Sequence, residues 1–480
     1  MAGGCRVWRV SRWNRSVNYL KLDVAEWAEE NFSSCDLGDA RRTKRAVKVA
    51  RQMAEHPDGS STAQTEDWGD LKAMYRLFGE EDVTFGAMAT PHWQKTRSLA
   101  QGTVLLIGDT TQTDFGIHRR SVQGLGPTGD GYGRGFFLHN SLMVNAHSGE
   151  IMGLAGQELF YRKPVPKQEN SYRVTQRSRE SEVWGRLIDA IGSPASAVRY
   201  VHVFDRGADN LDVFCHCRQN GCDWVIRAAR LHRNVESVES EDGSLRPLGE
   251  VLDRQPVRGT YELTVRAAQK RPARTATLEV RFTQVTLHRP EKRATKYLRS
   301  IGFESLTQWV VDVREVDPPA GVAPLRWVLW TSLPVIDFDA AWQIIEYYER
   351  RWLIEEFHKA IKTGCRLEAR LYRDAKALEA VAGVVSVLAV RLLQLKTVAT
   401  AQPELPAVRL VPGIWLTALR EMRRGKKILT VRDFFRHLAG LGGFLMRKGD
   451  GEPGWMTLWK GLEKLTSFIR GYLAGMQKCG

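Results

Sequence analysis

The stretch that decides the fold runs from Tyr347 to Lys362 and reads YYERRWLIEEFHKAIK. It has neither Gly nor Pro, is rich in helix formers and precedes Thr363-Gly364, so we predict one helix that ends there. At about 100° per residue, one face of this helix carries Tyr348, Arg351, Glu355 and Lys362. A separate apolar arc holds Leu353, Ile354, Phe357, Ala360 and Ile361. One face can therefore enter a core while the other presents an acid, two cations and a phenol.

The neighbouring acid Glu356 lies about 100° round the helix from Glu355, off the polar face, so Glu355 is the better functional candidate. A solvated surface helix with charge pairs four residues apart would show the same pattern. The helix alone does not separate these interpretations.

The net charge favours a polyanionic partner. The chain has 480 residues, enough for two or three domains, with 70 Lys and Arg against 55 Asp and Glu, a net charge of +15. Nucleic acid is favoured over an acidic membrane, although a merely basic protein would carry the same charge.

The cysteines and the apolar runs indicate the cellular compartment and whether the chain spans a membrane. Seven Cys without framework spacing indicate a reducing compartment, and Cys215, Cys217 and Cys222 lack the second half of a zinc site. The longest apolar run, residues 380–390, is too short for a membrane span and predicts a buried helix. Residues 1–22 are basic and lack the apolar segment of a secretory signal. We expect this extension to be disordered, with a DNA-contacting arm as the alternative.

Residues 23–80 are predicted to form a small helical DNA-binding unit. Helices are expected at 25–32, 40–51 and 68–78, with Asp39 capping the second. That second helix is basic on one side and could reach phosphates or base edges with Arg41, Arg42, Lys44 and Arg45. A surface helix that only looks basic is the alternative.

Two short apolar runs, each followed by an acid, predict buried core strands. Residues 103–109 end in Asp109, and residues 200–205 end in Asp205. Asp209 and Asp212 are rivals of Asp205. Strands at 136–144 and 151–160 predict an antiparallel meander after the first run, and helices are expected at 172–191 and 210–219, followed by a strand at 224–227.

The rest of the chain contains a strand-rich segment and then a helical segment. Residues from about 230 to 331 alternate polar and apolar in strands at 261–265, 277–282 and 285–287, punctuated by Lys and Arg, which predicts a strand-rich insertion. Residues 326–332 return to the core. After about residue 396 the chain is helical and amphipathic, and the apolar repeat Leu458, Leu462, Leu465 and Ile469 fits either a packed core or a self-association face.

The three acids Asp109, Asp205 and Glu355 suggest a metal site. Carboxylates are the ligands that Mg²⁺ and Mn²⁺ prefer, and a two-metal site can activate water and steady the leaving oxygen of a phosphodiester. Arg351 and Lys362 would supply cations for phosphate oxygens. The alternative is that the acids are unrelated surface residues.

The spacing Tyr348, Arg351, Glu355 and Lys362 resembles the Y-R-E-K signature of bacterial insertion-sequence DDE transposases, in their Tn-five-like branch. Further similar stretches are Gly108-Asp109-Thr110-Thr111, Phe204-Asp205-Arg206, residues 325–329, 37–43 and 441–444. The resemblance covers nearly the whole chain from Asp23. It implies an α/β fold: an RNase H-like catalytic core (81–398) interrupted by the β-rich insertion, a helical N-terminal DNA-binding domain (23–80) and a helical C-terminal dimerisation domain (399–480).

The resemblance also implies chemistry and partners. Asp109, Asp205 and Glu355 would be catalytic and hold two Mg²⁺ ions, for which Mn²⁺ could substitute. Tyr348, Arg351 and Lys362 would grip phosphates of a transposon end, Trp327 would stack on a flipped base, and Arg227 would lie near the DNA. The implied reaction is cut-and-paste transposition: nicking, hairpin formation, hairpin opening and strand transfer. The partners would be double-stranded DNA, as terminal inverted repeats and target, and a second copy in a synaptic homodimer, in the bacterial cytoplasm at the nucleoid and without a membrane.

Two other functions stay open at this point. One is a non-catalytic DNA-binding protein that represses transposition. The other is a structure-selective nuclease on the same RNase H-like fold, which would cut DNA without joining it.

Overall fold

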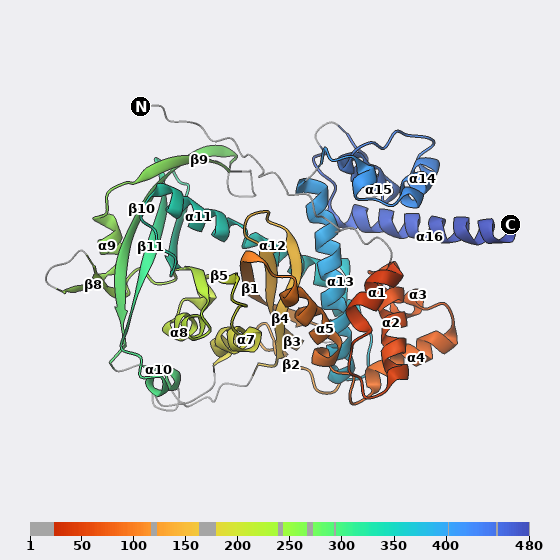
Figure 1. Ribbon diagram of the computed structural model, residues 1–480, viewed down its shortest axis with the longest axis horizontal. Coiled ribbons are helices and arrows are strands. Elements are labelled where there is room, and N and C mark those ends of the chain that lie inside the picture. The colour runs from red at the N-terminus through yellow and green to blue at the C-terminus, as the bar shows by residue number, and fades with distance from the viewer. Residues whose placement is uncertain are drawn as a thin grey trace.

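The computed structural model describes residues 24–116, 122–162, 179–238, 243–265, 272–291, 294–401, 403–447 and 450–479 (Figure 1). The extension 1–22, predicted to be disordered, lies outside these ranges. So do residues 172–178 of the helix predicted at 172–191, of which the described part forms α7 (Val183–Ile191) after a single 3₁₀ turn.

The N-terminal region is helical, as predicted. Its helices are α1 (Val24–Phe32), α2 (Ala40–Glu55), α3 (Ser61–Gln64), α4 (Trp68–Gly79) and α5 (Phe85–Ser98). Asp39 caps α2 as expected, because its side chain accepts a hydrogen bond from the amide of Arg41. Phe32 and Phe78 are fully buried between these helices and continue into the main core.

The described strands form one mixed sheet of twelve. Its order is β2-β3-β1-β5-β6-β12-β11-β10-β7-β8, with β4 added on β3 and β9 on β10. The predicted meander is confirmed: β1 (Gly102–Asp114), β3 (Gly133–Asn145) and β4 (Ile151–Phe160) are antiparallel neighbours. A short strand that we did not predict, β2 (Gly126–Thr128), pairs with β3. In contrast, β5 (Val198–Phe204) runs parallel to both β1 and β6 (Asp223–Arg227).

The strand-rich insertion extends this same sheet. Its strands are β7 (Asn234–Ser237), β8 (Leu245–Pro247), β9 (Gly259–Val265), β10 (Arg274–His288) and β11 (Ser305–Val316), with the short helices α9 (Leu248–Asp253) and α10 (Lys296–Ser300). The separate strands predicted at 277–282 and 285–287 are one strand, because Thr283 and Gln284 continue the pairing of β10 with β11. β12 (Arg326–Thr331) then returns to the core between β11 and β6.

Helices cover both faces of the sheet. α7 and α8 (Leu211–Gln219) pack on one face and contribute to one hydrophobic cluster. On the other side, the long helix α13 (Ala375–Ala401) contacts α5 and β4 and forms the spine of the larger cluster. By length and composition α13 could cross a membrane, but 89% of its apolar window is buried, which confirms the prediction of a core helix.

The C-terminal helices pack around the end of α13 (Figure 1). They are α14 (Gly413–Met422), α15 (Val431–Leu441) and α16 (Trp455–Cys479). Leu458, Leu462, Leu465 and Ile469 are buried within the chain itself. Of the two explanations for this apolar repeat, the packed core therefore accounts for these four side chains.

One buried arginine ties the N-terminal helices to the segment after the Y-R-E-K stretch. Arg370 is 3% exposed and donates hydrogen bonds to the carbonyls of Pro57, Gly59 and Cys365 and to the side chain of Gln64. A buried carbonyl that loses its donor costs about 1–3 kcal/mol.

We predict that Arg370→Met lowers the free energy of unfolding by about 3 kcal/mol or more, because several acceptors lose their donor together. The matched control is Arg373→Met, which removes an exposed guanidinium three residues away and should change it by less than about 0.5 kcal/mol. Urea unfolding of both variants measures the difference, and equal stabilities would contradict this role for Arg370.

Candidate active site

The Y-R-E-K stretch is not the single helix that we predicted. The structure divides it into α11 (Phe338–Glu349), α12 (Trp352–Lys359) and a π-helical turn (Ala360–Gly364). The break arises because the amides of Arg351 and Leu353 bond to the carbonyls of Tyr348 and Arg350, three residues back instead of four. The predicted end at Gly364 and the predicted burial of the apolar arc are confirmed.

Asp109 lies within its strand and not at the strand's end, which corrects the prediction. β1 continues to Asp114 because residues 109–114 keep pairing with β3. The parallel pairing with β5, however, has its last partners at Ile107 and Val203. Asp109 on β1 and Asp205 just after β5 each follow these partners by two residues. The two acids therefore lie side by side on adjacent strands.

Glu355 joins these two acids through Arg351. The Arg351 guanidinium lies 3.7 Å from a carboxylate oxygen of Asp109 and 2.5 Å from one of Glu355. The pKa of the Asp109 carboxyl is raised to about 6, first by burial and then by the negative charge of Asp205, with Glu355 adding to it. Asp109 therefore lies close enough to Asp205 and to Glu355 to be repelled by each, and Arg351 is the cation between Asp109 and Glu355.

Tyr348 and Arg227 border this group. Tyr348 is buried, at 8% exposure, which raises the pKa of its hydroxyl. The positive charge of Arg227, which also hydrogen-bonds to it, opposes that rise. Arg227 in turn donates to the carbonyl of Arg326 at the start of β12. β6, β12 and α11 thus hold the phenol and a guanidinium beside the acids.

Two predicted DNA contacts, Lys362 and Trp327, have partners outside this group. Lys362 is in the π-helical turn, and its ammonium lies 3.6 Å from Glu368. Trp327 is half-buried on β12 and packs against the hydrophobic core. No contact in the described part of the chain joins either side chain to the three acids.

The rival acids have structural partners. Asp209 is buried, forms an ion pair with Arg233 at 2.7 Å and accepts from the amide of Ala229. Asp212 accepts a hydrogen bond from Thr295. Glu356 is buried against two lysines, away from the face of Glu355.

A buried polar network behind the acids escaped the sequence analysis. Asn140, the β3 partner of Asp109, bonds to His358 of α12 at 3.1 Å and accepts from Gln157 of β4. Burial, with the charges of Lys362 and Arg351, lowers the pKa of His358 to about 3, so the imidazole is neutral. The available signal was the polar run His139-Asn140-Ser141 inside the otherwise apolar strand predicted at 136–144.

Three family models match the chain. A transposase DNA-binding model covers residues 24–83, a transposase DDE domain covers 170–390, and a Tn5 transposase dimerisation domain covers 387–477. The chain belongs to the Tn5-like DDE transposases. Its activity is the catalysis of cut-and-paste transposition. Asp205 and Glu355 lie within the DDE match, whereas Asp109 precedes it and is a candidate through its position beside Asp205.

A DDE domain implies use of a divalent metal, and the acids of this transposase fit that requirement in pairs. No three Asp, Glu, His or Cys side chains among the described residues are close enough to surround one ion. Mg²⁺ is usually held by one or two carboxylates together with waters and substrate phosphates. Asp109 with Asp205, and Asp109 with Glu355, could each supply such a pair once Glu355 leaves Arg351.

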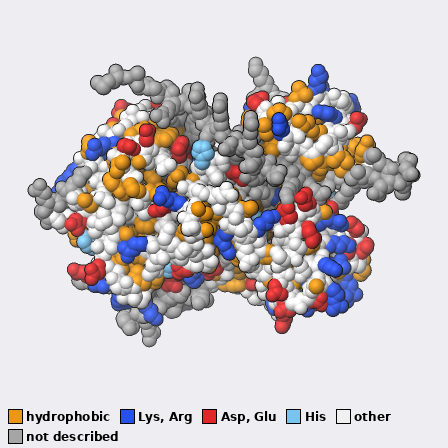
Figure 2. All heavy atoms as spheres, viewed as in Figure 1, with side chains coloured by type: hydrophobic (Ala, Val, Ile, Leu, Met, Phe, Trp, Pro, Cys, Tyr) orange, Lys and Arg blue, Asp and Glu red, His pale blue; other side chains and the backbone are white. Residues whose placement is uncertain are grey.

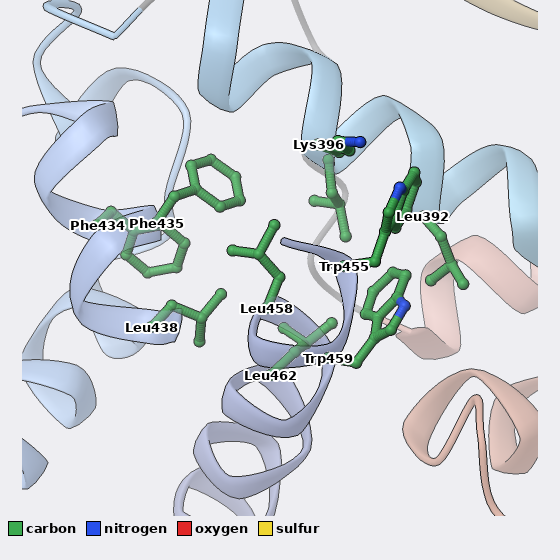
Figure 3. Close-up of a pocket in the computed structure, with 10 residues that line it drawn as sticks. Leu392, Lys396, Phe434, Phe435, Leu438, Trp455, Leu458, Trp459 and Leu462 are labelled. Carbon is green, nitrogen blue, oxygen red and sulfur yellow. The ribbon is translucent and has the colours of Figure 1, made fainter. Parts of the chain in front are cut away.

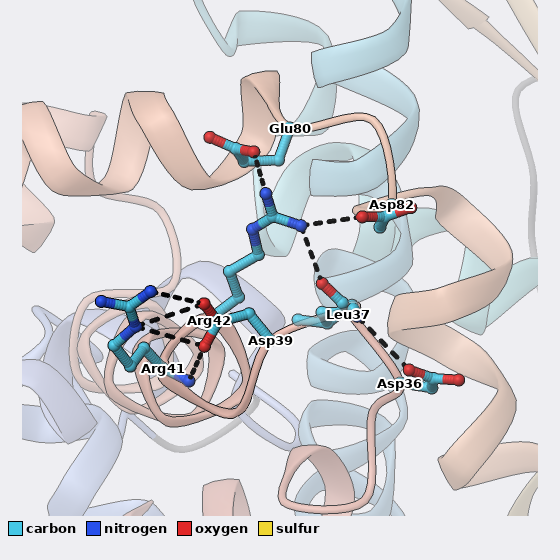
Figure 4. A network of polar contacts seen from close by, with 8 residues as sticks. Asp36, Leu37, Asp39, Arg41, Arg42, Glu80 and Asp82 are labelled. Atoms are coloured by element: carbon cyan, nitrogen blue, oxygen red, sulfur yellow. Dashed lines mark hydrogen bonds and ion pairs between the residues drawn. The ribbon is translucent and has the colours of Figure 1, made fainter.

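The four predicted DNA contacts on α2 differ in their availability. The Arg42 guanidinium pairs with Glu80 and Asp82 and donates a hydrogen bond to the carbonyl of Leu37 (Figure 4). Arg45 pairs with the buried Asp70. The side chain of Arg41, by contrast, is 91% exposed and pairs with the helix cap Asp39, while Lys44 is exposed.

The surface of the transposase in Figure 2 carries Lys and Arg along the outer edge of the N-terminal helices, with acidic side chains between them. This mixture agrees with the pairing of Arg42 and Arg45. Only part of the basic character of α2 is therefore free to meet a polyanion.

The raised pKa of Asp109 predicts a pH-dependent stability in metal-free protein. An acid whose pKa rises from 3.8 to about 6 on folding costs stability as pH increases through that window, and the full cost applies above pH 6. Asp109→Asn should therefore raise the free energy of unfolding at pH 8 by up to about 3 kcal/mol, but by little at pH 4.

The measurement is urea unfolding in EDTA at both pH values. Glu81→Gln, which neutralises an exposed carboxylate, should show no such difference. An Asp109→Asn variant that is less stable at pH 8 than the wild type would contradict the inferred repulsion.

Proposed function

We propose that Asp109, Asp205 and Glu355 are the catalytic residues of this transposase and bind two Mg²⁺ ions, for which Mn²⁺ can substitute. The observation that carries the proposal is the placement of Asp109 and Asp205 at one level of adjacent parallel strands, with Glu355 linked to Asp109 through Arg351. Two such Mg²⁺ ions, when bound, would activate water and stabilise the leaving oxygen at a phosphodiester.

The protein's own groups would bind and orient the DNA end. Arg351 would exchange its carboxylate partners for phosphate oxygens, which would leave Glu355 able to hold a cation. Tyr348 and Arg227 hold the adjacent phosphates, supported by the hydrogen bond between the two side chains beside the acids. Lys362 and Trp327 are proposed contacts further along the DNA, with Trp327 stacking on a flipped base.

The proposed reaction follows the order implied by the resemblance. Water nicks the transposon end, the freed 3′-hydroxyl forms a hairpin on the opposite strand, the hairpin opens and the end joins target DNA. The partners are double-stranded terminal inverted repeats and target DNA at the bacterial nucleoid. The active form is a homodimer, supported by the match to the dimerisation domain.

We propose domain limits at 1–22 for the basic extension, 23–80 for DNA binding, 81–398 for catalysis with the insertion at about 230–331, and 399–480 for dimerisation. Two features cross these limits. The N-terminal helices share the core of α13, and α13 itself extends past residue 398.

A nicking assay tests the three acids. Wild-type protein is incubated with Mg²⁺ and linear DNA that carries the gene with its native flanking sequence, and nicks and joined products are mapped. Asp109→Ala, Asp205→Ala and Glu355→Ala should each lower nicking at least about 1,000-fold, because charge stabilisation at the phosphorus is lost, with binding of the same DNA within about threefold.

The control is Asp212→Ala, which removes a neighbouring acid outside the group and should nick normally. Metal-dependent nicking without joined products would favour the nuclease, and binding without nicking would favour the repressor. Nicking by any of the three triad variants at the wild-type rate would exclude that acid from catalysis.

Salt-dependent binding tests the proposed DNA contacts of α2. Arg41→Ala with Lys44→Ala should weaken binding to the flanking DNA and reduce the slope of log affinity against log salt by about 2, because two phosphate contacts are lost. Lys72→Ala, which removes an exposed cation from α4, should leave the slope unchanged. An unchanged slope in the double variant would show that these two residues do not contact phosphate.

A further inference from the structure

Glu356, the neighbour of Glu355, joins three helices. Its side chain is 12% exposed and accepts from the Lys359 ammonium at 2.9 Å, within α12. Its other oxygen accepts from the Trp455 indole of α16 at 2.8 Å and from the ammonium of Lys396 on α13. One carboxylate thus links α12 to two helices that are remote in sequence.

The partners of Glu356 also contact each other. The Lys396 ammonium lies 4.6 Å from the centre of the Trp455 ring, a cation–π arrangement. Figure 3 shows both side chains at the wall of an apolar pocket formed by α13, α15 and α16. Lys396 and Trp455 both lie within the residues that match the dimerisation domain.

A second contact holds the far end of the same helical segment. Trp459 follows Trp455 by one turn on α16, and a Cβ at Gly364 would lie 3.0 Å from its indole nitrogen. The close approach requires Gly364, which ends the π-helical turn. α16 therefore contacts the segment at Glu356 and again at Gly364, two turns later.

These contacts matter because α12 is separated from α11. The backbone hydrogen bonds at Arg351 and Leu353 span three residues instead of four, so α12 does not continue the α-helical register of α11. Contacts with other elements can therefore contribute to the rotation of α12 about its own axis. A rotation of about 20° would move a carboxylate roughly 6 Å from the helix axis by roughly 2 Å. Displacements of about 1 Å are enough to cost roughly 100-fold in rate.

We propose that Glu356 is a positioning residue, which sets the rotation of α12, and so the place of Glu355, by binding Lys396 of α13 and Trp455 of α16. The inference rests on the proposed role of Glu355. Any rearrangement of the C-terminal helices when two copies meet would then reach the active site through this carboxylate.

The test compares the nicking rate at saturating protein and Mg²⁺ with the affinity for the same flanking DNA. Glu356→Gln keeps an acceptor for Trp455 but loses the charge that binds Lys396. It should slow nicking at least about tenfold with affinity within about twofold. Lys396→Met and Trp455→Phe should slow nicking in the same way, and they test the contact from the other helices if Glu356→Gln does not fold.

The matched control is Lys359→Met, which removes the partner within α12 itself and should nick within about twofold of the wild type. The double variant Glu356→Gln with Lys396→Met should be no slower than the slower single variant, because both remove one contact. Wild-type rates in Glu356→Gln, an equal loss in Lys359→Met or fully additive losses would overturn the inference. A wild-type protein that does not nick would instead overturn the proposed function.

Discussion

The structure depends on the enforced closeness of like charges. Asp109 and Asp205 emerge at one level of two neighbouring strands, and Glu355 approaches them from α12. In the absence of a cation, burial and mutual repulsion raise the pKa of Asp109, and Arg351 is shared between Asp109 and Glu355. A fold that maintains this arrangement carries an electrostatic cost once Asp109 is ionised, and bound cations would relieve it.

The surrounding elements hold that arrangement in place from several directions. Parallel pairing of β1 with β5 sets the level of the two aspartates, while Asn140, His358 and Gln157 fasten α12 to β3 and β4. From the opposite side, Glu356 binds α13 and α16. The position of Glu355 therefore depends on residues from the catalytic sheet and from the C-terminal helices together. Arg370 connects the N-terminal helices to the segment that follows.

Local pattern was enough to predict most elements, and it also supplied the three acids as candidates. The meander, the capped helix α2, the burial of the apolar arc and the preference for Glu355 over Glu356 all follow from periodicity and turn chemistry. The length of β1 did not, since pairing with β3 continues the strand through the polar residues 109–114. The break at Arg350–Arg351 was hidden too, because all its residues are good helix formers. Arg42, Glu356 and His358 each also have partners 38 to 218 residues away, and no local pattern encodes those.

The central claim is that these three acids hold a pair of divalent cations beside a DNA phosphate. The most direct measurement is anomalous X-ray diffraction from crystals of the protein with its flanking DNA end and Mn²⁺. Two anomalous peaks are expected beside Asp109, Asp205 and Glu355, whose carboxylates would hold the two cations. An absence of peaks at these carboxylates, with Mn²⁺ bound elsewhere or Arg351 still bridging Asp109 and Glu355, would contradict the claim.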